Sequence, residues 1–156
     1  MEKKMIKYIF LLFLATLTVA CCDGFCKGEK LCNQINSNKV SALNNYDICR
    51  IRRRNDYYEI HKPNGEFEMY LSIKKDRFYY KNYYSKKDSA MINALVDVIR
   101  VINKHKVYDL IILGTYHYYF FQNGDMVTNG ATKYVSEHPN GIKIKDDWYY
   151  YKNESQ

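Results

Sequence analysis

One stretch of helical periodicity, set among segments with the pattern of strands, limits the folds open to this chain. Its apolar positions recur at helical spacing: Met91, Leu95, Val98 and Ile102. Ser85 comes before this stretch and Asp88 follows three residues later, an arrangement typical of a capped helix start. The pattern predicts a single main helix over about residues 86–104.

The segments on both sides of this helix have strand character. Residues 67–73 alternate between apolar and polar side chains, which indicates a strand with one buried face. Asn-Gly pairs at residues 64–65, 123–124 and 140–141 predict turns. The expected strands cover residues 48–60, 67–73, 78–84, 107–121 (with Gly114 as a bulge or break), 132–135, 142–145 and 148–152. We therefore predict an α+β fold, an antiparallel, Tyr-rich sheet with the helix packed on one face.

The first 20 residues have the pattern of an export signal. Lys3, Lys4 and Lys7 give a positive start, and residues 9–19 form an uncharged, mostly apolar run. The small residue Ala20 follows this run. This run is too short to span a bilayer comfortably, since a spanning helix needs about 20 residues. We expect residues 1–20 to be removed, so that the remaining chain works outside the cytoplasm.

The end of this signal, Thr18-Val19-Ala20-Cys21, resembles the lipobox of bacterial lipoproteins. The resemblance implies cleavage before Cys21, a diacylglyceryl group on its thiol and an acylated amino terminus. It covers only the first 21 residues, and Thr18 departs from the pattern because leucine is usual there. The implied location is the cell envelope, membrane-anchored and facing the periplasm. The alternative is cleavage without lipid, which would give a freely secreted, extracellular protein of viral or eukaryotic type; the sequon at Asn153 would permit a glycan.

The cysteines fall into one anchor candidate and four disulfide candidates. With Cys21 lipidated, two disulfides could form among Cys22, Cys26, Cys32 and Cys49, in any of three pairings. No C-x2-C unit occurs, and export favours disulfides, so no metal is expected. Residues 21–45 are polar and predict a Cys-containing tether, and residues 46–156 a single α+β domain.

Tyrosine is the most distinctive residue type, with 17 in 156 residues. Adjacent strand residues point to opposite faces, so each Tyr pair would place one ring on the face away from the helix. A row of exposed phenols suits protein recognition; cross-strand packing is the alternative. The candidate binding residues are Tyr58, Tyr70, Tyr80, Tyr84, His117, Tyr119, Trp148 and Tyr150.

Positive charge is concentrated in one run. The first 20 residues carry +2 of the formal net charge of +7, which leaves +5 for the rest. Arg50, Arg52, Arg53 and Arg54 form a basic patch that could contact anionic lipid headgroups or an acidic partner. The alternative is a solvated strand edge guarded by charge. Export argues against a nucleic-acid partner.

Catalytic motifs are absent from the sequence. It has no Gly-x-Ser-x-Gly and no phosphate loop, and His117 has no nucleophile motif beside it. We expect no enzyme and no cofactor; a small hydrolase that uses His117 is the weakest alternative. The favoured hypothesis is an envelope lipoprotein that binds another protein, as an inhibitor, an immunity protein or an assembly factor.

Overall fold

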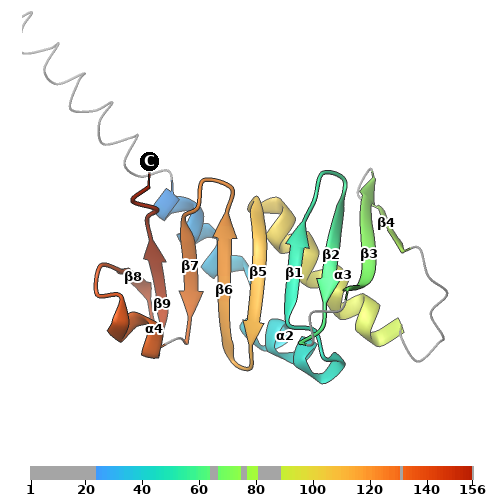
Figure 1. The fold of residues 1–156 in the computed structure, drawn as a ribbon, viewed down its shortest axis with the longest axis horizontal. Coiled ribbons are helices and arrows are strands. Elements are labelled where there is room, and N and C mark those ends of the chain that lie inside the picture. The colour runs from blue at the N-terminus through green and yellow to red at the C-terminus, as the bar shows by residue number, and fades with distance from the viewer. Residues whose placement is uncertain (1–23, 64–66, 75–76, 81–88, 131, 156) are drawn as a thin grey trace, which may run out of the picture.

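The computed structural model describes residues 24–63, 67–74, 77–80, 89–130 and 132–155. Its strands form one sheet in the order β4-β3-β2-β1-β5-β6-β7-β9-β8, with every neighbouring pair antiparallel (Figure 1). The strands are β1 (Arg50–Arg53), β2 (Tyr57–His61), β3 (Phe67–Lys74), β4 (Arg77–Tyr80), β5 (Val107–Leu113), β6 (Tyr116–Phe121), β7 (Met126–Asn129), β8 (Ile142–Lys145) and β9 (Trp148–Tyr151).

The helices lie mainly on one side of this sheet. They are a helical segment over residues 24–34, α2 (Ser37–Ser41), the 3-10 helix η1 (Ala42–Tyr46), α3 (Ser89–Lys104) and the short α4 (Thr132–Glu137). Figure 1 shows α3 and the chain from residue 24 to 46 behind the sheet. The predicted α+β architecture with one main helix is confirmed. The expected cap at Ser85 and Asp88 falls outside the described residues.

The core lies between α3 and the sheet. Leu95, Ile99 and Ile102 of α3 have no exposed surface, and they share one core cluster with Ile51 and Leu110 of the central strands. Burial alternates along β2, β6 and β9, as in Tyr57–His61, so these strands send every second side chain into this core. We call the opposite side of the sheet the open face.

The segment expected to be a tether is part of the domain. Leu31, Cys32, Ile35, Val40 and Leu43 are all buried in the core cluster, and the chain around them is helical. The prediction of a tether is therefore wrong for residues 24–45. Its apolar positions fall at helical spacing and cover the sheet beside α3, which keeps them out of water.

Three of the expected strands differ from the structure. Residues 48–60 form two strands, β1 and β2, because the polar residues 54–56 make the turn of a hairpin. Residues 107–121 divide into β5 and β6 at Gly114, whose φ of +63° is easily adopted by glycine. Residues 132–135 belong to α4 instead of a strand, and β7 was not expected. The closing hairpin of β8 and β9 is confirmed.

Candidate functional site on the open face of the sheet

Most of the candidate binding residues lie in the core. Five of them face the helices and are at most 7% exposed: Tyr58, His117, Tyr119, Trp148 and Tyr150. They cannot present a surface to a partner, so these choices are wrong. The side chains of Tyr70 and Tyr80, and all of Tyr84, lie outside the described part of the chain. The buried members serve packing, as in the stacked rings of Tyr119 and Trp148, whose centroids are 5.6 Å apart.

Their sequence neighbours form an aromatic cluster on the open face. Tyr134 of α4 meets Tyr118 of β6 edge-to-face at 5.6 Å and Tyr151 of β9 at 5.2 Å between ring centroids. Its other contact is a parallel stack with His138, at 4.0 Å and an interplanar angle of 10°. The His138 Nδ1 also lies 3.0 Å from the carbonyl oxygen of Tyr134, which fixes the imidazole plane. Tyr134 thereby attaches α4 to this face.

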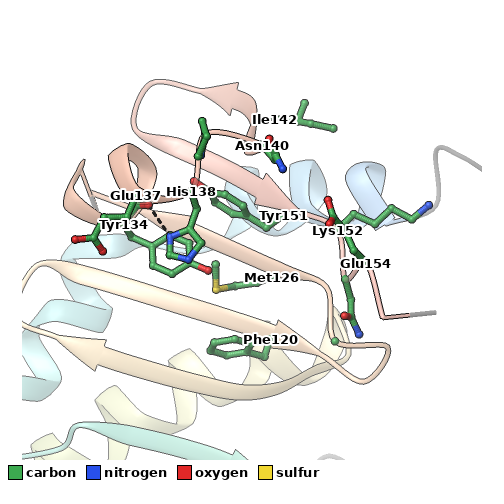
Figure 2. A pocket seen from close by; sticks show the side chains of 13 residues that line it. Phe120, Met126, Tyr134, Glu137, His138, Asn140, Ile142, Tyr151, Lys152 and Glu154 are labelled. Atoms are coloured by element: carbon green, nitrogen blue, oxygen red, sulfur yellow. Dashed lines mark hydrogen bonds between the residues drawn. The ribbon is translucent and has the colours of Figure 1, made fainter.

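A hollow of about 470 Å³ opens beside this cluster, and we call it the aromatic hollow. Figure 2 shows Met126 and Phe120 on the strands, with Tyr134 and His138 on one side and Lys152 and Glu154 on the other. The full lining is Phe120, Gly124, Met126, Tyr134, Glu137, His138, Pro139, Asn140, Ile142, Tyr151, Lys152, Asn153 and Glu154. Apolar and aromatic surface thus lies inside a rim of both charge signs.

The aromatic hollow has an exposed apolar edge and a buried polar group in its wall. Ile142 stands 52% exposed at its edge, unusual for a large apolar side chain. The Tyr151 hydroxyl is buried without a hydrogen-bond partner in the described structure. Burial, then the neighbouring Tyr134 and Tyr149, raises the pKa of Tyr151, so the hydroxyl keeps its proton.

The basic run is divided among different environments. Arg50 makes a bidentate pair with Asp109 of β5 through Nε, at 2.9 and 3.1 Å, and through Nη2. The Nε of Arg52 lies 3.6 Å from the same carboxylate. Arg54 pairs with Glu59 at 3.0 Å. Asp109 is only 6% exposed, so Arg50 and Arg52 chiefly neutralise a buried carboxylate on the open face.

His117 contacts a serine, but the surroundings do not make a hydrolytic site. Its Nε2 lies 3.0 Å from the Ser41 hydroxyl of α2, and its Nδ1 lies 3.4 Å from the Tyr119 hydroxyl where a triad would have a carboxylate. Burial lowers the pKa of His117 to about 4, which makes it a weak base at neutral pH. Neither His117 nor Ser41 lines the aromatic hollow. The contact attaches α2 to β6.

A second contact of the same kind lies one helical turn earlier. Asn129 of β7 donates a hydrogen bond to the Ser37 hydroxyl at 3.0 Å. Ser37 and Ser41 therefore bind polar side chains of two neighbouring strands. This buried polar row was missed from the sequence. The four-residue spacing of the two serines was its only signal.

Two of the four disulfide candidates, Cys32 and Cys49, pack as thiols, and the predicted pairing itself stays a prediction. Cys32 and Cys49 are free thiols, and Cys22 lies outside the described residues. Burial in the core raises the pKa of Cys32 to about 12, so this thiol is unreactive in the folded chain. The Cys49 thiol donates instead to the carbonyl oxygen of His61 at 3.5 Å. Both cysteines act as small packing residues.

Within the described ranges, no three side chains of His, Cys, Asp or Glu converge as a metal site would require. The helices described there are all too short or too polar to cross a bilayer. Comparison with known proteins found no match for this chain among family models, curated proteins or solved structures.

Proposed function

We propose that this chain is an exported, lipid-anchored protein of the cell envelope that binds another protein through the aromatic hollow. The observation that carries the binding proposal is the hollow itself, in which Phe120, Tyr134 and Tyr151 line a space that a large side chain could fill. Protein interfaces commonly combine an apolar centre with a polar rim, and their binding energy is concentrated in a few anchoring side chains. The export and anchoring part rests on the sequence of residues 1–21.

A protein segment suits this site better than a small molecule. The hollow is open to solvent, and its edge includes an exposed Ile142 and the charged side chains of Glu137 and Lys152. A partner could insert one apolar or aromatic residue against Phe120 and pair its own charges with the rim. This arrangement serves an inhibitor, an immunity protein or an assembly factor, and it requires no catalytic group.

Site-specific crosslinking tests the binding surface. A photo-reactive benzophenone side chain at position 142 should capture a defined envelope protein in living cells. The same group at position 97, exposed on α3 on the opposite side of the sheet, is the matched control and should not capture it. Equal capture from both positions, or none from position 142, would contradict the proposal.

The intact mass of the mature protein tests the anchor separately. We expect a chain that begins at Cys21 and carries the mass of three acyl chains or of a diacylglyceryl group. An unmodified chain that begins at Cys21 would instead identify the freely secreted form. The crosslinking result does not depend on this outcome, so the two parts of the proposal can fail independently.

A further inference from the structure

A second hollow, of about 330 Å³, is lined by residues of the β1–β2 hairpin, the start of β5 and the β6–β7 turn. Figure 1 shows these three elements at the same end of the sheet. We call this space the basic hollow. Its described lining contains three cationic side chains and no carboxylate: Arg53, Arg54, Asn55, Lys106, Tyr108 and Gln122. The other lining groups, an amide, a phenol and a second amide, can all donate hydrogen bonds.

Two cations of the basic hollow, Arg53 and Lys106, are available to a ligand, unlike Arg50 and Arg52. Arg53 and Lys106 form no ion pair with any described carboxylate. Arg54, the third cation, pairs through its Nε with Glu59 at 3.0 Å. Arg50 and Arg52, by contrast, lie against Asp109. The basic run therefore supplies two arginines that neutralise Asp109 and two arginines, Arg53 and Arg54, that line the basic hollow.

The positions of Arg53 and Lys106 are set by regular structure. Arg53 ends β1 and pairs across the hairpin with Tyr58. Lys106 follows the last turn of α3 with a φ of +59°, and its amide donates to the carbonyl of Asn103 at 3.0 Å. Two cations held on rigid elements around a small space form a preorganised anion site. Proteins commonly bind phosphate oxygens with guanidinium and ammonium groups together with neutral hydrogen-bond donors.

We infer that the basic hollow binds a phosphoryl group, either as the headgroup of an anionic lipid or as a phosphate in solution. The site goes beyond the proposed protein-binding function and uses none of the residues that line the aromatic hollow. Only the lipid source depends on the proposed anchor.

The position of the N-terminal segment favours the lipid source. Gly24 packs directly against Asp125 and Tyr150, at the β6–β7 turn that also supplies Gln122 to the basic hollow. Cys21 precedes Gly24 by three residues. An extended chain spans at most about 3.6 Å per residue, so a lipid on Cys21 would enter the membrane within about 11 Å of Gly24. The end of the domain with the basic hollow would then lie at the bilayer surface.

Binding to vesicles and to soluble phosphate tests this inference. The chain from residue 21 contains the complete described core, which runs from Leu31 to Tyr150, so it can be produced without acylation. We expect it to bind phosphatidylcholine vesicles only when they contain phosphatidylglycerol, and binding should weaken with added salt. The double variant Arg53→Gln/Lys106→Gln should lose about tenfold or more in affinity for these vesicles.

A matched control separates the hollow from net charge. The double variant Lys133→Gln/Lys143→Gln removes the same charge from exposed positions outside the hollow and should bind nearly as well as the original chain. Inorganic pyrophosphate, titrated in solution and followed by NMR, reports the free-phosphate source through the amides of Asn55 and Lys106. Binding in either arm supports the site and identifies its source. The inference would be overturned if the two double variants lost equal affinity for the vesicles. It would also be overturned if the chain bound neither the vesicles nor pyrophosphate.

Discussion

The two faces of the sheet use the same residue type for different purposes. On the helix-covered face, Tyr58 and Tyr119 are fully buried, and Tyr150 donates its hydroxyl to Asp125 at 2.8 Å. On the open face, Tyr118 and Tyr151 are half-buried and form the aromatic cluster with Tyr134. Adjacent tyrosines in one strand therefore differ in role only because they point to opposite faces. The difference between core and surface is decided by register, and four expected effects test it.

The largest effect should come from adjacent tyrosines in β6. Tyr119→Ala removes a fully buried ring stacked on Trp148 and should lower the free energy of unfolding by about 3–5 kcal/mol. Tyr118→Ala, one residue away on the open face, should cost about 1 kcal/mol. Urea denaturation of both variants measures the difference. Equal losses would mean that the two faces are equally important for stability.

The buried imidazole of His117 should make stability fall in acid. Its pKa is about 4 in the folded chain and 6.5 when unfolded, so the unfolded state binds the proton first as the pH falls. The contribution of the neutral imidazole to the free energy of unfolding is complete above pH 6.5. About 3 kcal/mol of it is lost as the pH falls from 6.5 to 4. The stability difference between the original chain and His117→Gln should shrink by this amount between pH 7 and pH 4.

Loss of a buried ion pair and loss of an exposed one should differ in their effect on the free energy of unfolding, by less than in the two comparisons above. Asp109→Asn weakens the neutralisation of Arg50 and Arg52 at a position 6% exposed and should cost about 1–3 kcal/mol. Asp97→Asn breaks an exposed pair with Lys39, at 2.6 Å, and should cost about 0.5 kcal/mol or less. Thermal unfolding at low and high salt compares them, because only the exposed pair should respond strongly to salt.

In the last comparison, a small effect on stability should accompany a large effect on binding. Tyr134→Ala removes the ring that forms one wall of the aromatic hollow but no core residue, and should cost about 1 kcal/mol or less. Crosslinking from position 142 should nevertheless be lost in this variant. Leu113→Ala alters another exposed apolar residue, outside the hollow, and should leave crosslinking intact. Crosslinking that survived Tyr134→Ala would place the partner elsewhere.

Local patterns predicted the parts of the fold that local forces determine. The α3 helix follows from its apolar spacing, and the β6–β7 turn from Asn123-Gly124, where Gly124 has a φ of +84°. Three of residues 132–135 are β-branched or aromatic (Thr132, Tyr134 and Val135), so this segment suggested a strand. They form a helix because Tyr134 packs against rings from β6 and β9, a contact between distant parts of the chain.

The candidate sites were harder to predict for the same reason. The choice between Tyr118 and Tyr119, or between Tyr150 and Tyr151, depends on which face a strand presents to the helices, and sequence alternation alone leaves both choices open. The basic run likewise divides only when β5 brings Asp109 beside Arg50 and Arg52. One signal was present and missed: Gly28, Leu31, Cys32 and Ile35 are spaced as one face of a helix.

The contacts of the Asp125 carboxylate also determine which part of the domain would bear an applied force. It accepts hydrogen bonds from Tyr150, from the Asn123 side chain and from the Asn153 amide at 3.0 Å, and Gly24 packs against it. A pull between an anchor on Cys21 and a partner held beside Tyr151 would pass through this joint and the neighbouring β9. The remaining strands would lie outside the force path, so such tension would strain one corner of the domain and leave most of the sheet unstretched.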